Sequence, residues 1–137
     1  MATLKSSTIE TTDGTISAGL NITNATGLQF TKAGYFPVTS LTSAATVAWD
    51  AGSNQSATLT LGHNVTISDA TNHAAGGVYL LRIVQGAAAK TVSWGSGYKW
   101  PGGSAPTMTG TASAVDVFTF VSDGTNMYGS FSGSQNY

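Results

Sequence analysis

The chain has 137 residues and few ionisable groups: 8% of its residues are charged, and its formal net charge is −1. Soluble domains carry roughly a quarter charged residues, so this neutral surface is suited to close contact with other proteins, because covering it removes few ions from water. The scattered Lys and Arg residues leave no basic field for nucleic acid, no segment reaches the ~20 apolar residues of a membrane helix, and the absence of cysteine excludes disulfides and thiolate chemistry.

A short repeat distinguishes residues 1–40 from the rest of the chain. The pattern Gly-Leu-x-apolar occurs at Gly19–Ile22 and returns at Gly27–Phe30. Repeats that cannot close a core alone pack against neighbours, so we expect an extended β-arm or short shaft that packs against partner chains. Its candidate contact residues are Ile16, Leu20, Ile22, Leu28 and Phe30. An alternative interpretation is a pair of edge strands on the main domain, and Pro37 marks the joint between the two parts.

Residues 41–137 show the pattern of an all-β domain. Apolar positions alternate with polar ones, and turn residues interrupt them about every eight to twelve positions, as in an antiparallel β-sandwich or jelly-roll-like domain. We expect a hairpin of Thr58–Leu61 with Val65–Ile67. A second hairpin is predicted for Val115–Val121 with Met127–Phe131, because the Asp-Gly pair between them readily supplies the positive φ of a tight turn.

The longest apolar run is Gly77–Val84. A strand that is apolar on both faces belongs in the middle of a sheet or at an interface. Arg82 lies within this run and needs an acceptor if it is buried, and Asp116 in the sequence Val-Asp-Val is the expected partner. We expect this structural ion pair to fix strand register and to take no part in catalysis.

Residues suited to catalysis or metal binding are few. His63, Asp69 and His73 have a spacing that could supply three metal ligands, but the turn-like sequence around both histidines favours ordinary turn positions. No Gly-x-Ser-x-Gly motif lies between a strand and a helix, and the thin set of acidic residues disfavours a small glycan-cleaving enzyme. We therefore expect no enzyme activity, no cofactor and no metal.

Three aromatic residues among glycines form the most distinctive segment, with Trp94, Tyr98 and Trp100 in seven positions. Such rings could form a contact platform for a sugar. The favoured interpretation is structural: tryptophans flanked by Gly and Pro seal the end of a β-sandwich while the glycines allow sharp turns.

Several segments together resemble a β-domain that recurs in structural proteins of tailed bacteriophages. They are Gly77–Gln85, Thr91–Trp94, Tyr98–Pro106, Val115–Val121 and Tyr128-Gly129. The resemblance covers about residues 41–137, and its most specific part is Lys99-Trp100-Pro101-Gly102-Gly103. It implies a virion structural protein without catalytic residues, because this domain commonly ends tail-fibre and other virion-surface polypeptides and also occurs as a small free-standing protein.

The short length of the chain favours a head decoration, or cement, protein over a tail fibre, because a tail fibre needs a long shaft. We expect it to be made in the bacterial host cytoplasm and to lie on the head surface of the virion. It would form a homo-oligomer, with a trimer favoured, and would bind the major capsid protein or other virion proteins. The alternative is a tail-fibre or receptor-binding tip that recognises a host surface glycan through Trp94, Tyr98 and Trp100.

Overall fold

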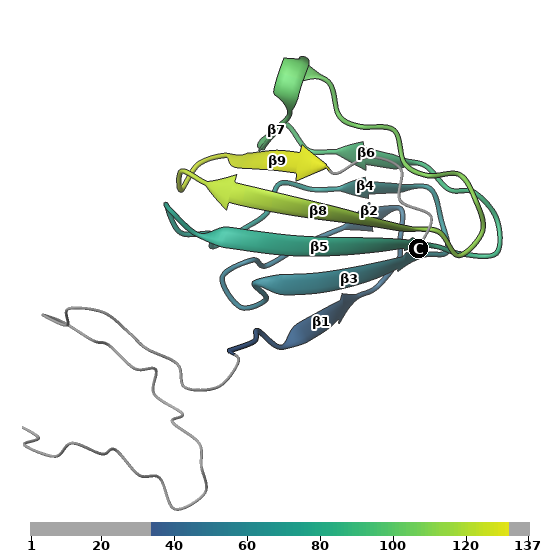
Figure 1. Ribbon diagram of the computed structural model, residues 1–137, viewed down its shortest axis with the longest axis horizontal. Helices are drawn as coiled ribbons and strands as arrows, with labels where there is room; N and C mark the ends of the chain where they lie inside the picture. Colours follow the sequence, from purple (N-terminus) through teal and green to yellow (C-terminus); the bar gives the residue numbers. More distant parts are fainter. Residues whose placement is uncertain (1–33, 132–137) are drawn as a thin grey trace, which may run out of the picture. The chain divides into compact units, whose positions relative to one another are not determined.

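The computed structural model describes residues 34–131, which fold into nine strands and one short 3-10 helix (Figure 1). The predicted all-β class is confirmed in this part of the chain. The strands are β1 (Val38–Leu41), β2 (Thr46–Val47), β3 (Ser56–Leu61), β4 (Val65–Ile67), β5 (Val78–Gln85), β6 (Val92–Trp94), β7 (Tyr98–Lys99), β8 (Val115–Ser122) and β9 (Met127–Phe131), and the helix η1 is Pro101–Gly103. No helix within residues 34–131 is long and apolar enough to cross a membrane.

The boundary between the two units of the chain falls between Gly34 and Tyr35. The predicted arm contacts lie outside the described residues; these are Ile16, Leu20, Ile22, Leu28 and Phe30. Residues 38–40, which the sequence assigned to the arm, instead belong to β1 and pair with β3.

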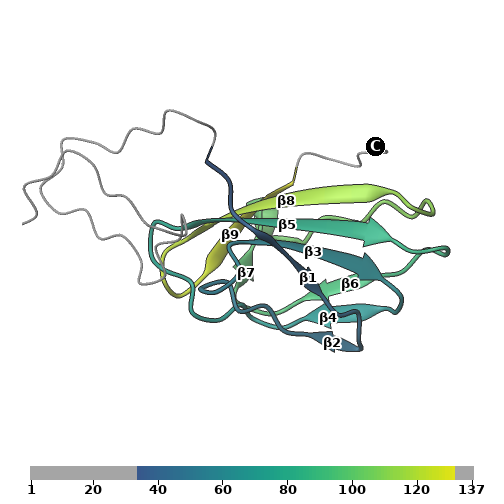
Figure 2. The ribbon, with the colours of Figure 1, turned by 90° about the horizontal axis from the view of Figure 1, so that it is seen from below.

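Two sheets make up the described body (Figure 2). One has six strands in the order β1-β3-β5-β8-β9-β7, and the other has three strands in the order β2-β4-β6. Only the β5–β8 and β8–β9 pairs are antiparallel, and the other neighbours in both sheets run parallel. The predicted antiparallel arrangement is therefore wrong for most of the strand pairs.

From β1 to β6 the chain alternates between the sheets, and each strand lies beside and parallel to the strand two positions earlier. The chain thus forms a coil of three turns, β1–β2, β3–β4 and β5–β6, with roughly 20 residues per turn, within the usual range of stacked repeats. The predicted hairpin of Thr58–Leu61 with Val65–Ile67 is wrong, because β3 and β4 belong to different sheets. At this corner the Gly62 N–H donates to Ser43 Oγ at 2.9 Å, which ties the corner to the preceding turn of the coil.

The antiparallel part of the six-stranded sheet agrees with the prediction from the sequence. Strands β8 and β9 form the predicted hairpin, with Ser122 opposite Met127, and Gly124 in its turn has a φ of 90°. The predicted central position of the Gly77–Val84 run is also confirmed, since β5 lies between β3 and β8.

The core lies between the two sheets and takes alternate residues from each strand. Leu59, Leu81 and Phe118 contribute from the six-stranded sheet, and Val47 and Ile67 from the other. All five side chains are buried, and this burial of apolar area is the main stabilising term for the fold.

Candidate interaction surface

The outward side of the six-stranded sheet is called the outer face here. Because side chains in a strand alternate between the two sides of the sheet, strand register places its residues in four rows. The rows are Val78, Val121, Tyr128 and Lys99; Val38, Ser56, Leu80, Thr119 and Ser130; Ser40, Thr58, Arg82 and Val117; and Thr60, Val84 and Val115.

Large apolar side chains are exposed on this face. Val38, Val78, Leu80, Val121 and Tyr128 each expose between 41% and 63% of their surface. Most of the remaining positions carry Ser, Thr or Val. At the usual strand spacing and rise, the face covers roughly 500 Å², and about half of its positions are apolar, the others being mostly Ser and Thr.

The face carries few charges. Its charged side chains are Arg82 in the interior, which is exposed, and Lys99 at the β7 edge, which lies opposite Tyr128 on the same side of the sheet. Lys99 Nζ donates to the Ser96 carbonyl oxygen at 2.7 Å. Away from these two cations, a partner that covers the outer face removes apolar and hydroxyl groups from water at little ionic cost.

The predicted ion pair of Arg82 with Asp116 is not formed. Arg82 lies opposite Val117 on the outer face, whereas Asp116 lies opposite Ile83 and is buried on the core side. The Asp116 carboxyl group instead accepts hydrogen bonds from Thr109, one from its N–H at 2.8 Å and one from its Oγ1 at 2.7 Å. Strand alternation places the two predicted partners on opposite sides of the sheet.

The three predicted platform residues come together and pack against the core, with Tyr98 buried and Trp94 and Trp100 half-buried. The Trp94 ring centroid lies 5.0 Å from that of Tyr98 and 4.9 Å from that of Trp100, and both contacts are edge-to-face. Trp94 and Trp100 also contact Phe118, at 5.1 Å and 5.8 Å. The rings thus form an interlocked cluster, which favours the structural role over a flat platform for a sugar.

The burial of the polar ring atoms also favours the structural role. Trp94 Nε1, Tyr98 Oη and Trp100 Nε1 are buried and have no hydrogen-bond partner among the described residues. Burial raises the pKa of the Tyr98 hydroxyl well above its usual range, and the nearby Asp69 charge adds to the effect. A ligand on the surface could not reach these three atoms in this arrangement.

His63, Asp69 and His73, the three possible metal ligands, lie apart and form separate hydrogen bonds. His63 Nδ1 lies 3.3 Å from Ser43 Oγ, and His73 Nδ1 lies 2.6 Å from Ser122 Oγ. Asp69 accepts a hydrogen bond from the Gly97 N–H at 2.7 Å. No group of three metal-ligating side chains occurs within residues 34–131.

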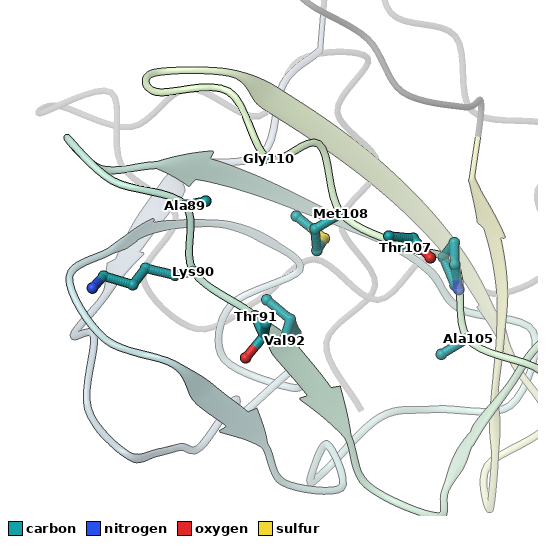
Figure 3. A pocket seen from close by; sticks show the side chains of 9 residues that line it. Ala89, Lys90, Thr91, Val92, Ala105, Thr107, Met108 and Gly110 are labelled. Atoms are coloured by element: carbon teal, nitrogen blue, oxygen red, sulfur yellow. The ribbon is translucent and has the colours of Figure 1, made fainter.

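A shallow pocket of about 400 Å³ lies between the start of β6 and the segment 105–110 (Figure 3). Lys90 is its one ionisable side chain, and Figure 3 shows it directed away from Met108. The lining residues are Ala89, Lys90, Thr91, Val92, Ala105, Pro106, Thr107, Met108 and Gly110.

The sequence did not identify the residues that carry the outer face. Their signal is the second set of apolar positions in the strands, namely Val115, Val117 and Val121 in β8 beside the inward Phe118 and Phe120. Such a double pattern is compatible with burial on both sides as well as with an interface, so the sequence left the choice open.

No protein-family model matches this chain, and no curated protein and no solved structure matches it. The candidate surface is therefore defined by the geometry of this chain alone.

Proposed function

We propose that this protein is a non-enzymatic structural component of a tailed-bacteriophage virion, and that it decorates the head and cements neighbouring capsid subunits. The observation that carries the proposal is the outer face, a surface mainly of valine, leucine and hydroxyl side chains on a continuous sheet. Surfaces of this kind mark sites of protein contact.

A cement protein needs a stable body and a broad contact, and no reacting group. The coil and the β8–β9 hairpin supply the body, which we propose to act as a β-sandwich with one side committed to contact. A specific interface covers about 800 Å² on each partner, so the outer face supplies more than half of such a contact. Many copies, each bound only to the assembled shell, stabilise the assembled state by mass action.

In this proposal the protein forms a homo-oligomer, with a trimer favoured, and binds the major capsid protein. The segment that precedes β1 reaches over or between capsid subunits in this proposal. The head surface is the proposed location, and the bacterial cytoplasm is the site of synthesis.

The proposal is tested with particles of the encoding phage from which this protein has been removed. Purified protein is added back, binding is measured by co-sedimentation, and the temperature of DNA release is followed with a dye. We expect binding and a higher release temperature. Failure of the wild-type protein to bind, or binding without a gain in heat resistance, would overturn the cement function.

A matched pair of variants tests whether the outer face makes the contact. Leu80→Asp places a charge on the outer face, and Thr66→Asp places one on the exposed side of the three-stranded sheet. We expect Leu80→Asp to lose binding and Thr66→Asp to retain it. Equal binding by the two variants would show that another surface holds the particle.

A further inference from the structure

Arg82 occupies the interior of the outer face and has no acidic neighbour there. Strand register places Thr58 on one side of it and Val117 on the other, while Leu80 and Val84 flank it along β5. None of these side chains can balance a guanidinium charge. Lys99 lies at the β7 edge of the face, so Arg82 is the one interior position where covering the face carries a large electrostatic cost.

That cost depends on what the covering surface presents. An apolar surface would take the guanidinium out of water with no compensation, which is strongly unfavourable. A carboxylate would meet it with two parallel hydrogen bonds, because the planar guanidinium fits a carboxylate in a bidentate arrangement.

We propose that the surface which covers the outer face is a different protein that presents an Asp or Glu carboxylate to Arg82. This inference rests on the proposed function and specifies the chemistry of the partner at that site. The partner surface is otherwise apolar or hydroxyl-bearing, to match the valine and threonine rows around Arg82.

A second copy bound face to face does not meet this requirement. The outer face holds no acidic residue, so two apposed faces would bury two guanidinium groups without a carboxylate from either. The described carboxylates lie elsewhere: Asp116 is buried in the core, Asp50 and Asp69 lie at coil corners, and Asp123 lies in the β8–β9 turn. Face-to-face pairing of two copies is therefore disfavoured.

The substitution Arg82→Leu distinguishes the two kinds of partner by the direction of its effect. If a carboxylate faces Arg82, the substitution leaves that carboxylate buried without a partner, and binding to the stripped particles weakens at least tenfold. If an apolar surface faces Arg82, the substitution removes a buried unpaired charge and binding becomes tighter. Arg82→Lys keeps the charge without the bidentate geometry and should fall between wild type and Arg82→Leu.

The control is Lys90→Leu, which removes a cation from a coil corner outside the outer face. We expect it to change particle affinity less than twofold. Each variant is first checked for an unchanged melting temperature and for an unchanged oligomeric state by light scattering.

The outcomes separate the inference from the proposed function. Absence of wild-type binding overturns the proposed function, and the inference falls with it. Wild-type binding with equal or tighter binding by Arg82→Leu overturns the inference and leaves the cement function standing. A change in the oligomeric state of isolated Arg82→Leu would show that a second copy covers this face, and would also overturn the inference.

Discussion

Asp116 shows how a buried acidic side chain is accommodated within a short stretch of sequence. Its two carboxyl oxygens accept the Thr109 N–H and Oγ1, which holds the 105–110 segment against β8. Buried polar groups are costly unless they are hydrogen-bonded. This local contact, and no long-range ion pair, therefore stabilises the Asp116 side chain in the core.

We expect Asp116→Ala to lower the free energy of unfolding by about 3 kcal/mol, because two strong buried hydrogen bonds are lost. Arg82→Ala should change it by less than about 0.5 kcal/mol, since this exposed side chain has no role in the fold. Urea denaturation of both variants and of the double variant measures these values. A coupling energy above about 1 kcal/mol between the two sites would contradict the separation seen here.

Gly129 is required by a close approach of an aromatic ring. A Cβ atom at this position would collide with the six-membered ring of Trp100. The strand β9 therefore passes directly under the aromatic cluster, and the absence of a side chain at Gly129 sets the position of Trp100.

We expect Gly129→Ala to destabilise the protein by about 1–3 kcal/mol, because the ring must move out of a packed cluster. Gly110→Ala is the matched control, since a Cβ there meets only Ala89 Cβ at 3.9 Å. Thermal unfolding and the near-ultraviolet signal of the tryptophans report the difference. Equal stability of the two variants would show that Trp100 relaxes without cost.

At the scale of elements, polar side chains join the successive turns of the coil at its corners. The Asn72 amide donates to Asp50 at 3.0 Å and is the main cause of the lowered pKa of the Asp50 carboxyl group. At the opposite corners, Asn64 Oδ1 accepts the Thr91 N–H at 3.0 Å. The abundance of Asn, Asp and Ser in the loops is thereby explained, because each turn must satisfy backbone groups of its neighbour.

The β8–β9 hairpin is closed by Asp123, whose carboxylate accepts the backbone N–H groups of Asn126 at 2.6 Å and Thr125 at 2.8 Å. These hydrogen bonds, the one from Asn126 first, lower the pKa of Asp123 to about 2. The Tyr128 hydroxyl donates to the same carboxylate at 3.0 Å, and this bond raises the pKa of Tyr128.

We expect the contribution of Asp123 to depend on pH in the acid range. A lowered pKa means that the ionised form is favoured by folding, so the contribution is complete above the unfolded value of about 4 and is lost as pH falls through about 2. The stability difference between wild type and Asp123→Ala should therefore be constant above pH of about 4 and shrink below it.

Acid titration of both proteins by circular dichroism measures this difference. Asp123→Ala should also lower the pKa of Tyr128 toward its usual value, which ultraviolet absorbance detects. A stability difference that is the same at pH of about 2 and at neutral pH would show that the carboxylate does not hold the turn.

At the scale of the whole molecule, the low charge of the chain predicts that it does not remain alone. We expect light scattering to give a mass of more than one chain at high concentration, with the trimer favoured. Because Arg82 opposes face-to-face pairing, Leu80→Asp should leave that mass unchanged. A monodisperse wild-type monomer at high concentration would contradict the homo-oligomer.

Much of the strand content was visible in the sequence, because alternation with a period of two and an Asp-Gly turn act locally. This is why the β8–β9 hairpin and the central position of β5 were predicted correctly. The coil was missed because its turns differ in length: Val38 pairs with Ser56, but Ser56 pairs with Leu80. Parallel neighbours are joined through the other sheet, so no short-range signal records them.

By itself, the sequence determined that the chain has few charges and that its residues 41–131 form β-strands, and it led us to expect contact with other proteins. The tertiary structure decided which strands are neighbours and which apolar side of each strand is covered. Alternation defines two sides of a strand but does not say which side meets the core, and only the stacking of distant segments settles that choice. For this reason Asp116 lies inside, whereas Arg82 stands on an apolar face that is open to a partner.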